Sequence, residues 1–166
     1  MVKREFTFDE LWNRLPFDIR NACALSMQDP VKHPEGSVET HTRQVFEYAS
    51  RVFDNDSDLL LSAIFHDLGK PETQKIMERD GVIKISNIGH EHRCEYYINK
   101  YFDLYSDMGA NKSKVVEICK NHMKAHYYRS GAMKKPNKRK MFEGLTYFND
   151  ILKFVECDTA GKKHIT

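Results

Sequence analysis

The 166-residue sequence has little of several features that would place it in a class at once. It contains no run of eighteen apolar residues, which a membrane-spanning helix requires, and its charged start lacks the apolar stretch of a signal peptide. The four cysteines are scattered and include no C-x-x-C pair, which argues against a zinc ribbon and against a disulfide scaffold. We therefore expect a cytoplasmic protein with reduced thiols and no membrane association.

Net charge is also small, at +2, so the chain as a whole creates no strong field that would favour nucleic acid or a membrane. Positive charge is concentrated in one run, interrupted by Pro136, which consists of Lys134, Lys135, Lys138, Arg139 and Lys140. This run is typical of a solvated loop, and a clamp for a nucleic-acid backbone is the alternative. The length and the 40% apolar content predict one globular domain over residues 1–166.

Hydrophobic periodicity predicts an all-α fold with one small β-hairpin. The chain reads Asp80-Gly81 between alternating apolar residues at about 74–87, which is a hairpin pattern. Gly69 and Pro71 are expected to stop the helix that precedes it. The predicted helical stretches are 9–27 with a break at Pro16, 37–53, 57–68, 90–104, 112–126, and 138–160 with a break near Gly144.

Several ionisable residues fall on the apolar faces of these helices. His41 lies three residues after Val38 and four before Val45, so it points inward with them. The 57–68 helix is apolar nearly all round and is therefore buried, which places His66 and Asp67, at its last turn, inside the core. A buried carboxylate costs several kcal/mol unless a cation or donors compensate it, and a metal ion would do so.

Three later helices deliver similar groups. Each of these groups extends the apolar stripe of its own helix: His90, His122 and Asp158. His92 lies off the stripe, and His126, one turn beyond His122, is a weaker candidate. A single inward histidine is more often a core residue than a ligand. Six ionisable groups from five helices are harder to explain as packing, because buried ionisable groups are rare unless they are paired or metal-bound.

This set predicts one or two divalent metal ions. The ligands expected for the first ion are His41, His66, Asp67 and Asp158, with Asp67 able to bridge. His90 and His122 would complete a second site or, with a single ion, bind the phosphate of a substrate. Imidazole and carboxylate ligands together suit Mn²⁺, Ni²⁺, Co²⁺, Fe²⁺ or Mg²⁺, and the ligand types do not choose among these ions.

Further cationic residues are candidates for substrate contact. Lys70, one turn past the His-Asp pair, would hold a phosphate oxygen and is, with Asp67, a candidate catalytic residue; a solvated lysine at a helix end is the alternative. His92 and Arg93 lie in the first turn of a helix, where anions are favoured. His33 would line the entrance to the site, and Arg43 is a lesser candidate that fits a surface position better.

Four strings of residues resemble a known family. They are His33-Pro34-Glu35-Gly36-Ser37-Val38 leading to His41, Ala63 to Pro71 around His66-Asp67, Asp80-Gly81 followed by Gly89-His90-Glu91, and Cys157 to Lys162 around Asp158. In this order they resemble the HD superfamily of metal-dependent phosphohydrolases. Over about residues 30–162 they look most like the HD domain of bacterial tRNA nucleotidyltransferases. The nucleotidyltransferase head of those enzymes is absent, so CCA addition is not implied.

The resemblance implies a helical HD domain that hydrolyses a phosphomonoester or phosphodiester of a nucleotide or RNA end, including a 2′,3′-cyclic phosphate, with metal-activated water as nucleophile. One alternative is a nucleotidase or a cyclic-nucleotide-signal hydrolase that acts on free nucleotides. Another is a non-catalytic module that binds RNA or protein, although the six filled ligand positions argue against it. The oligomeric state does not follow from the sequence.

Overall fold

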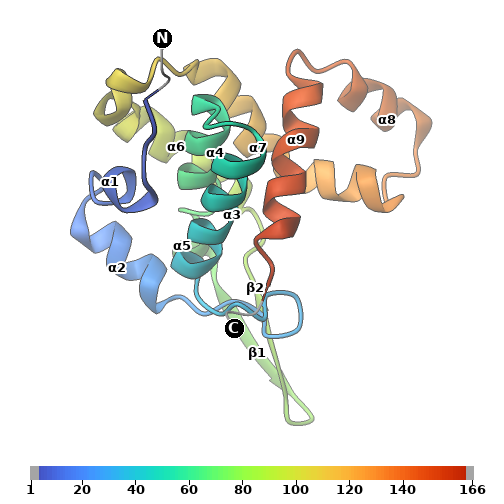
Figure 1. Ribbon diagram of the computed structural model, residues 1–166. Helices are drawn as coiled ribbons and strands as arrows, with labels where there is room; N and C mark the ends of the chain where they lie inside the picture. The colour runs from blue at the N-terminus through green and yellow to red at the C-terminus, as the bar shows by residue number, and fades with distance from the viewer. Residues whose placement is uncertain (1–3, 164–166) are drawn as a thin grey trace.

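A computed structural model describes residues 4–163 (Figure 1). The protein is mostly helical with a single antiparallel hairpin, as the sequence predicts. In chain order the elements are α1 (Phe8–Trp12), α2 (Phe17–Leu25), α3 (Val38–Val52), α4 (Ser57–Phe65), α5 (Lys70–Thr73), β1 (Lys75–Arg79), β2 (Val82–Ser86), α6 (His90–Tyr101), the 3-10 helix η1 (Phe102–Met108), α7 (Lys112–Ser130), α8 (Pro136–Glu143) and α9 (Phe148–Ala160).

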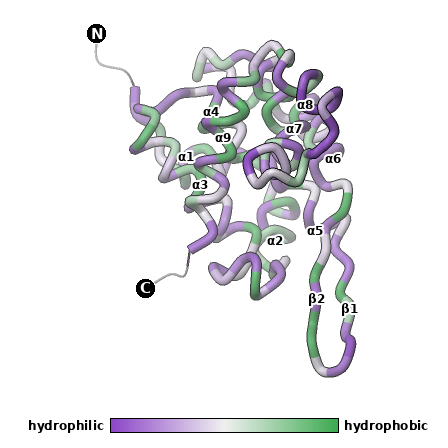
Figure 2. The backbone as a smooth tube through the Cα atoms, turned by 90° about the vertical axis from the view of Figure 1, so that its right-hand side faces the viewer, coloured by the Kyte–Doolittle hydropathy of each residue, from purple (hydrophilic) through white to green (hydrophobic). Residues whose placement is uncertain are grey.

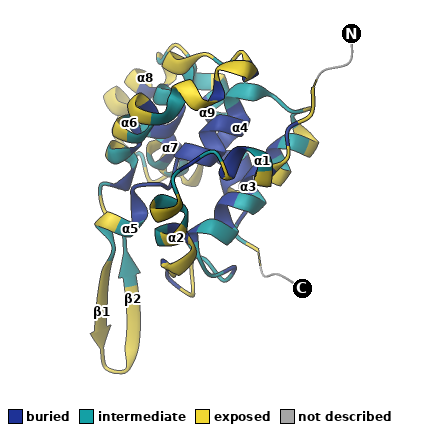
Figure 3. Cartoon of the chain, turned by 90° about the vertical axis from the view of Figure 1, so that its left-hand side faces the viewer, coloured by how far each residue is buried: buried dark blue, intermediate teal, exposed yellow. Residues whose placement is uncertain are grey.

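The hairpin of β1 and β2 extends away from the helices (Figure 2). Its strands pair in an antiparallel register that ends at Arg79 opposite Val82. Asp80 and Gly81, between them, both have positive φ angles, of 52° and 77°, as the tight turn predicted from Asp-Gly requires. Strand β1 is exposed along its whole length (Figure 3), so the hairpin adds little to the core.

The expectation that Gly69 and Pro71 stop the helical segment is wrong in part. Helix α4 ends at Phe65, but the short helix α5 begins at Lys70, with Pro71 in its first turn, where a missing N–H costs nothing. Gly69 permits a close approach to α6, because a Cβ atom there would lie 2.7 Å from the Cβ atom of Arg93. The glycine therefore joins two helical pieces and lets α6 pack against the joint.

Two other helix predictions need smaller changes. Helix α7 continues to Ser130, one turn beyond the expected end, and stops at Gly131, which has a φ of 82°. The break near Gly144 is confirmed, since α8 and α9 are separate helices. No helix in the described part of the chain is both long enough and apolar enough to cross a membrane.

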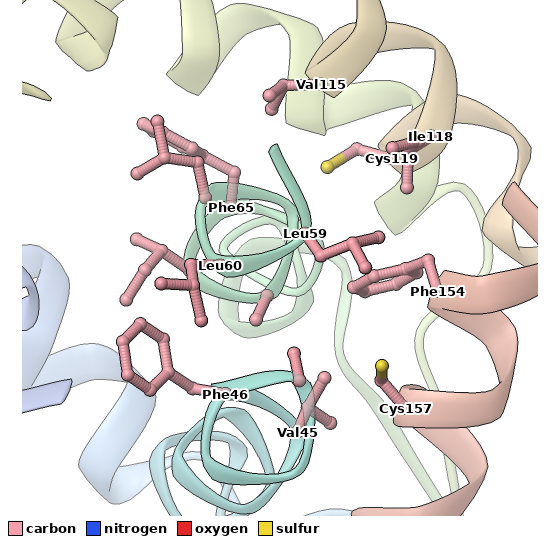
Figure 4. Close-up of a cluster of buried hydrophobic side chains, with 14 of the residues drawn as sticks. Val45, Phe46, Leu59, Leu60, Phe65, Val115, Ile118, Cys119, Phe154 and Cys157 are labelled. Carbon is pink, nitrogen blue, oxygen red and sulfur yellow. The ribbon is translucent and has the colours of Figure 1, made fainter. Parts of the chain in front are cut away.

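Helix α4 lies in the centre of the core. It packs against α3, α7 and α9, and every residue from Leu59 to Phe65 is buried. Figure 4 shows the side chains of these helices meeting around it: Val45 and Phe46 from α3, Ile118 and Cys119 from α7, and Phe154 and Cys157 from α9. Asp56 caps the start of α4 by accepting a hydrogen bond from the Leu59 N–H at 3.1 Å. Because α4 is buried among α3, α7 and α9, its last turn also lies away from water.

Candidate metal centre

The structure brings all six predicted ligands together. They come from α3, the end of α4, α6, α7 and α9, and each of them is at most 5% exposed: His41, His66, Asp67, His90, His122 and Asp158. They form two groups that share Asp67, and within each group the candidate ligand atoms lie within 4.8 Å of one another. The helical stripes read from the sequence thus converge on one place.

The first group joins two imidazoles and two carboxylates. His41 Nε2 lies 2.7 Å from Asp158 Oδ1 and 3.6 Å from Asp67 Oδ2. His66 Nε2 lies 3.1 Å from Asp67 Oδ2 and 3.3 Å from Asp158 Oδ1. Two nitrogens and two oxygens therefore face the same point, in a set of four donors that suits a divalent transition ion.

The second group uses the other oxygen of Asp67. His90 Nε2 lies 3.2 Å from Asp67 Oδ1, and His122 Nε2 lies 3.8 Å from the same atom. The two imidazole Nε2 atoms are 3.1 Å apart. Because Asp67 directs one oxygen to each group, its carboxylate is placed to bridge two ions.

The imidazoles are oriented by backbone carbonyls. The Nδ1 atoms of His66 and His90 lie 2.7 Å and 2.8 Å from the carbonyl oxygens of Ala63 and Asn87, which can only accept a hydrogen bond. His122 Nδ1 contacts the Cys119 carbonyl in the same way. When Nδ1 carries the donated hydrogen, a neutral imidazole presents a lone pair at Nε2. All three rings thus direct Nε2 into the cluster, which favours a cation there.

The cluster also leaves polar atoms without partners. Among the described residues, His66 Nε2 and both carboxylate oxygens of Asp67 are buried and make no well-formed hydrogen bond. Such atoms are costly in an interior unless something compensates them. A divalent ion would satisfy the nitrogen and the oxygens together, so the residues present fit the metal that the sequence predicts.

The pKa values describe how the cluster is balanced without a metal. Burial raises the pKa of Asp67, but the facing positive charge of His66 outweighs burial and holds this pKa well below its usual range. Burial lowers the pKa of His66, yet the charge of Asp67 raises it to about 10. Burial, together with the neighbouring His90 and His66, lowers the pKa of His122 to about 3. A proton on His66 therefore supplies part of the positive charge that the carboxylates need.

With this geometry established, the comparisons with known proteins assign the family. A family model described as the HD domain matches residues 38–143, more than half of the chain. The chain belongs to the HD domain family. HD domains are in general metal-dependent phosphohydrolases, and the buried cluster is compatible with that chemistry. A comparison with curated proteins gave no match. Asp158 lies beyond the matched residues of this HD protein and joins the cluster through the packing of α9.

Two of the predicted substrate contacts lie beside the cluster. Lys70 is only 6% exposed, and its Nζ atom lies 3.1 Å from Asp67 Oδ2 and donates to Gln28 Oε1 at 2.5 Å. The alternative of a solvated lysine at a helix end therefore does not hold. The ring of His33 lies against that of His41, with centroids 5.0 Å apart. His33 thus stands at the edge of the metal centre.

The other predicted contacts lie outside it. The side chain of His92 is 68% exposed, and Arg93 forms an ion pair with Glu72 at 2.8 Å. A cleft, described below, opens onto the cluster, and neither His92 nor Arg93 lines it. Arg43 pairs with Asp9 at 2.8 Å on the surface, as expected for a lesser candidate.

The sequence gives no role to one residue of the site, Glu35, and makes another, His126, only a weaker candidate. The Glu35 carboxylate is completely buried, and its Oε1 atom lies 3.0 Å from His41 Nδ1 and 2.7 Å from His33 Nδ1. Burial raises its pKa, but these two histidines lower it to about 2. His126 Nε2 lies 2.6 Å from Asp158 Oδ2. The spacing of four residues from His122 was a signal for His126, whereas the loop around Glu35 has no periodicity to read.

A cleft of about 550 Å³ opens onto the cluster. Its lining includes Asp67, His90, His122 and Asp158, together with the end of β2 and the start of α6. The lysines that line it are Lys32, Lys70 and Lys162. Carboxylates that can hold an ion and lysines that attract an anion therefore face one space, which suits a phosphate ester.

Proposed function

We propose that this HD protein is a metal-dependent phosphohydrolase that cleaves a phosphomonoester or phosphodiester, including a 2′,3′-cyclic phosphate, of a nucleotide or an RNA end. One observation carries the proposal: Asp67 is buried, neither of its oxygens makes a well-formed hydrogen bond, and imidazole Nε2 atoms approach both of them. A buried carboxylate without well-formed hydrogen bonds costs stability, and such groups cluster at binding and catalytic sites.

The proposed ligand sets follow the two groups in the structure. His41, His66, Asp67 and Asp158 would hold the first ion, and Asp67 with His90 and His122 would hold the second. A bound divalent ion would supply Lewis acidity, neutralising phosphate oxygens and activating water as a nucleophile. If only one ion binds, His90 and His122 would contact the phosphate.

Lys70 is proposed to act beside the ligands. Its ammonium group is held between the Asp67 carboxylate and the Gln28 amide oxygen, so it has little conformational freedom left to lose when an anion binds. A lysine fixed in this position would neutralise a phosphate oxygen as negative charge develops there. His33 would contact the substrate from the edge of the cleft.

The substrate class is supported by size and by resemblance. A cleft of about 550 Å³ lies within the range of cavities that hold small ligands of nucleotide size. The strings around His41, His66 and His90 resemble the HD domain of tRNA nucleotidyltransferases, which favours RNA ends over free nucleotides. The buried residues form one core from Phe6 to Cys157, which supports the proposal that residues 1–166 act as a single domain.

A panel of substrates tests this function. Phosphomonoesters, 2′,3′-cyclic and 3′,5′-cyclic nucleotides and nucleoside triphosphates would be incubated with added Mn²⁺, Ni²⁺, Co²⁺ or Mg²⁺. Wild type is expected to hydrolyse at least one class, and Asp67→Ala to lose that activity. The matched control is Asp103→Ala, at an exposed aspartate of η1. Full activity in Asp67→Ala would rule out this site, and a silent wild type would favour a binding module.

A further inference from the structure

Charge is distributed unevenly along the chain. Residues 118–142, between Glu117 and Glu143, contain eight lysines and arginines and no acidic residue. The rest of the chain holds the remaining 18 basic residues against all 24 acidic ones, a net charge of −6. We call residues 118–142 the basic arm. The net charge of +2 is therefore the sum of a strongly positive basic arm and a negatively charged remainder of the chain. Such a separation of charge directs anionic partners to the positive surface.

The positive charges of the basic arm are mostly free of ion pairs. Lys120 pairs with Glu95 at 3.0 Å, and Arg139 stacks on the ring of Tyr128 at 4.5 Å. The other six side chains are exposed and form no ion pair with any described residue: Lys124, Arg129, Lys134, Lys135, Lys138 and Lys140. Their charge is thus available to a partner.

The basic arm is also held in a fixed shape. Phe142 of α8 is buried against Tyr128 of α7 and Phe148 of α9, with ring centroids 5.1 Å and 5.5 Å apart. The Tyr128 hydroxyl donates to Glu143 at 2.9 Å, and Arg139 donates to the Met133 carbonyl at 3.3 Å. Helix α8 stands beyond α9 at the edge of the molecule (Figure 1). The backbone that carries the lysines is therefore held in place by packing. These lysines would lose less conformational entropy on binding than lysines of a mobile loop.

The same arm reaches the cleft. Helix α7 contributes His122, Met123, His126 and Tyr127 to the cleft lining before it continues to Ser130. From His122 to Ser130 the helix rises roughly 12 Å away from the cleft lining. Tyr127 is 51% exposed at the cleft and offers a ring on which a base can stack. One helix thus connects the metal centre to the unpaired cations.

We propose that the basic arm binds the sugar-phosphate backbone of a single-stranded nucleic acid whose terminal phosphate enters the cleft. The inference rests on the proposed function and narrows it, because a free nucleotide would fill the cleft and leave the arm unused. A single strand is favoured over a duplex, since the end must reach groups that are almost completely buried. RNA and DNA share the backbone charge that the arm recognises, so the experiment includes both.

Binding without catalysis tests the arm directly. Fluorescence anisotropy would follow labelled single-stranded RNA and DNA 12-mers in EDTA over a range of salt concentrations. The arm variant carries Lys134→Gln, Lys135→Gln and Lys138→Gln; the control, with equal loss of charge, carries Arg51→Gln, Lys100→Gln and Lys112→Gln on exposed sites elsewhere. The arm variant should bind at least tenfold more weakly, with a salt slope smaller by about 2, and the control within twofold of wild type. Equal weakening in both variants, no binding by wild type, or tighter arm-dependent binding to anionic vesicles or poly-glutamate would overturn the proposal.

A second measurement distinguishes nucleic-acid binding by the basic arm from the proposed phosphohydrolase activity. The kcat/KM for a 12-mer with a terminal phosphate would be compared with that for bis(p-nitrophenyl) phosphate, a small phosphodiester. In the arm variant this ratio should fall at least tenfold through KM, and in the control it should stay constant. Hydrolysis of the small diester with no arm-dependent effect on the 12-mer would overturn the inference while the function stands. Arm-dependent binding with no hydrolysis of any substrate would support the arm and overturn the function.

Discussion

The inner end of α4 and the β1–β2 hairpin are close in sequence but opposite in composition and environment. At the end of α4, His66 and Asp67 are ionisable and at most 1% exposed; in the hairpin, Ile76 and Ile83 are apolar and more than half exposed. Both regions invert the usual distribution of residues between core and surface. The buried charges are the costly inversion, and the structure gathers compensating groups around them. The exposed isoleucines cost little, because the hairpin stands apart from the core. The comparison shows that the core gathers its buried ionisable groups at one place, as a metal centre would require.

The largest expected effect is on catalytic activity, when the buried His66 and the exposed His92 are each replaced by alanine. His66→Ala removes a proposed ligand and is expected to lower kcat/KM by roughly 10³-fold or more. His92→Ala, at a side chain 68% exposed, is expected to change it less than threefold. Steady-state kinetics on the best substrate of the panel would measure both. A loss in His92→Ala as large as that in His66→Ala would mean that the first turn of α6 contributes to the active site.

The next effect compares two isoleucines by stability. Ile64 in α4 has no exposed surface, whereas Ile83 in β2 is 52% exposed. Ile64→Ala should lower the free energy of unfolding by about 2–5 kcal/mol, and Ile83→Ala by about 0.5 kcal/mol or less. Urea denaturation of the metal-free protein would measure the difference. Similar losses would show that the hairpin is part of the cooperative core after all.

A smaller effect concerns Glu35, which lies behind His41. Its carboxylate lies 3.0 Å from His41 Nδ1, the arrangement that fixes the tautomer and raises the basicity of a metal-binding imidazole. Glu35→Gln keeps the size but loses the charge, and we expect metal affinity to fall about 10–100-fold with little change in stability. Calorimetric titration with Mn²⁺ would measure it. An unchanged affinity would assign the orientation of His41 to the Gly161 carbonyl, 3.2 Å from the same nitrogen.

The smallest expected effect is the number of protons that the protein releases when a metal ion binds. The pKa of His66 is raised to about 10 without metal, so at pH 8 its Nε2 atom is protonated and a metal ion must displace that proton. Binding at pH 8 should therefore release about one proton, and affinity should increase as the pH rises toward 10. Titrations in two buffers with different ionisation enthalpies would measure the release. An enthalpy that is the same in both buffers would contradict the protonated state of His66.

Much of the fold and of the site could be predicted because both depend on helical periodicity. The stripes that placed His41, His90 and His122 inward are the same stripes that build the core, and Asp80-Gly81 specified the hairpin turn through its backbone angles. Features that depend on tertiary contacts were harder to predict. The sequence predicts a helix stop at Pro71, yet Pro71 lies in the first turn of α5, and this joint depends on the packing of α6 against Gly69. Glu35 lies in a loop, where no repeating pattern distinguishes a buried carboxylate from an exposed one.

Bound metal is the most direct test that the cluster is a metal centre. Wild type, Asp67→Ala and the exposed control Asp103→Ala would be dialysed to equilibrium against Mn²⁺ and analysed for metal per chain. Because Asp67 belongs to both ligand groups, its loss should leave almost no bound ion, whereas wild type and Asp103→Ala should each hold at least one. Equal metal content in Asp67→Ala and wild type would contradict the assignment of this cluster as the metal centre.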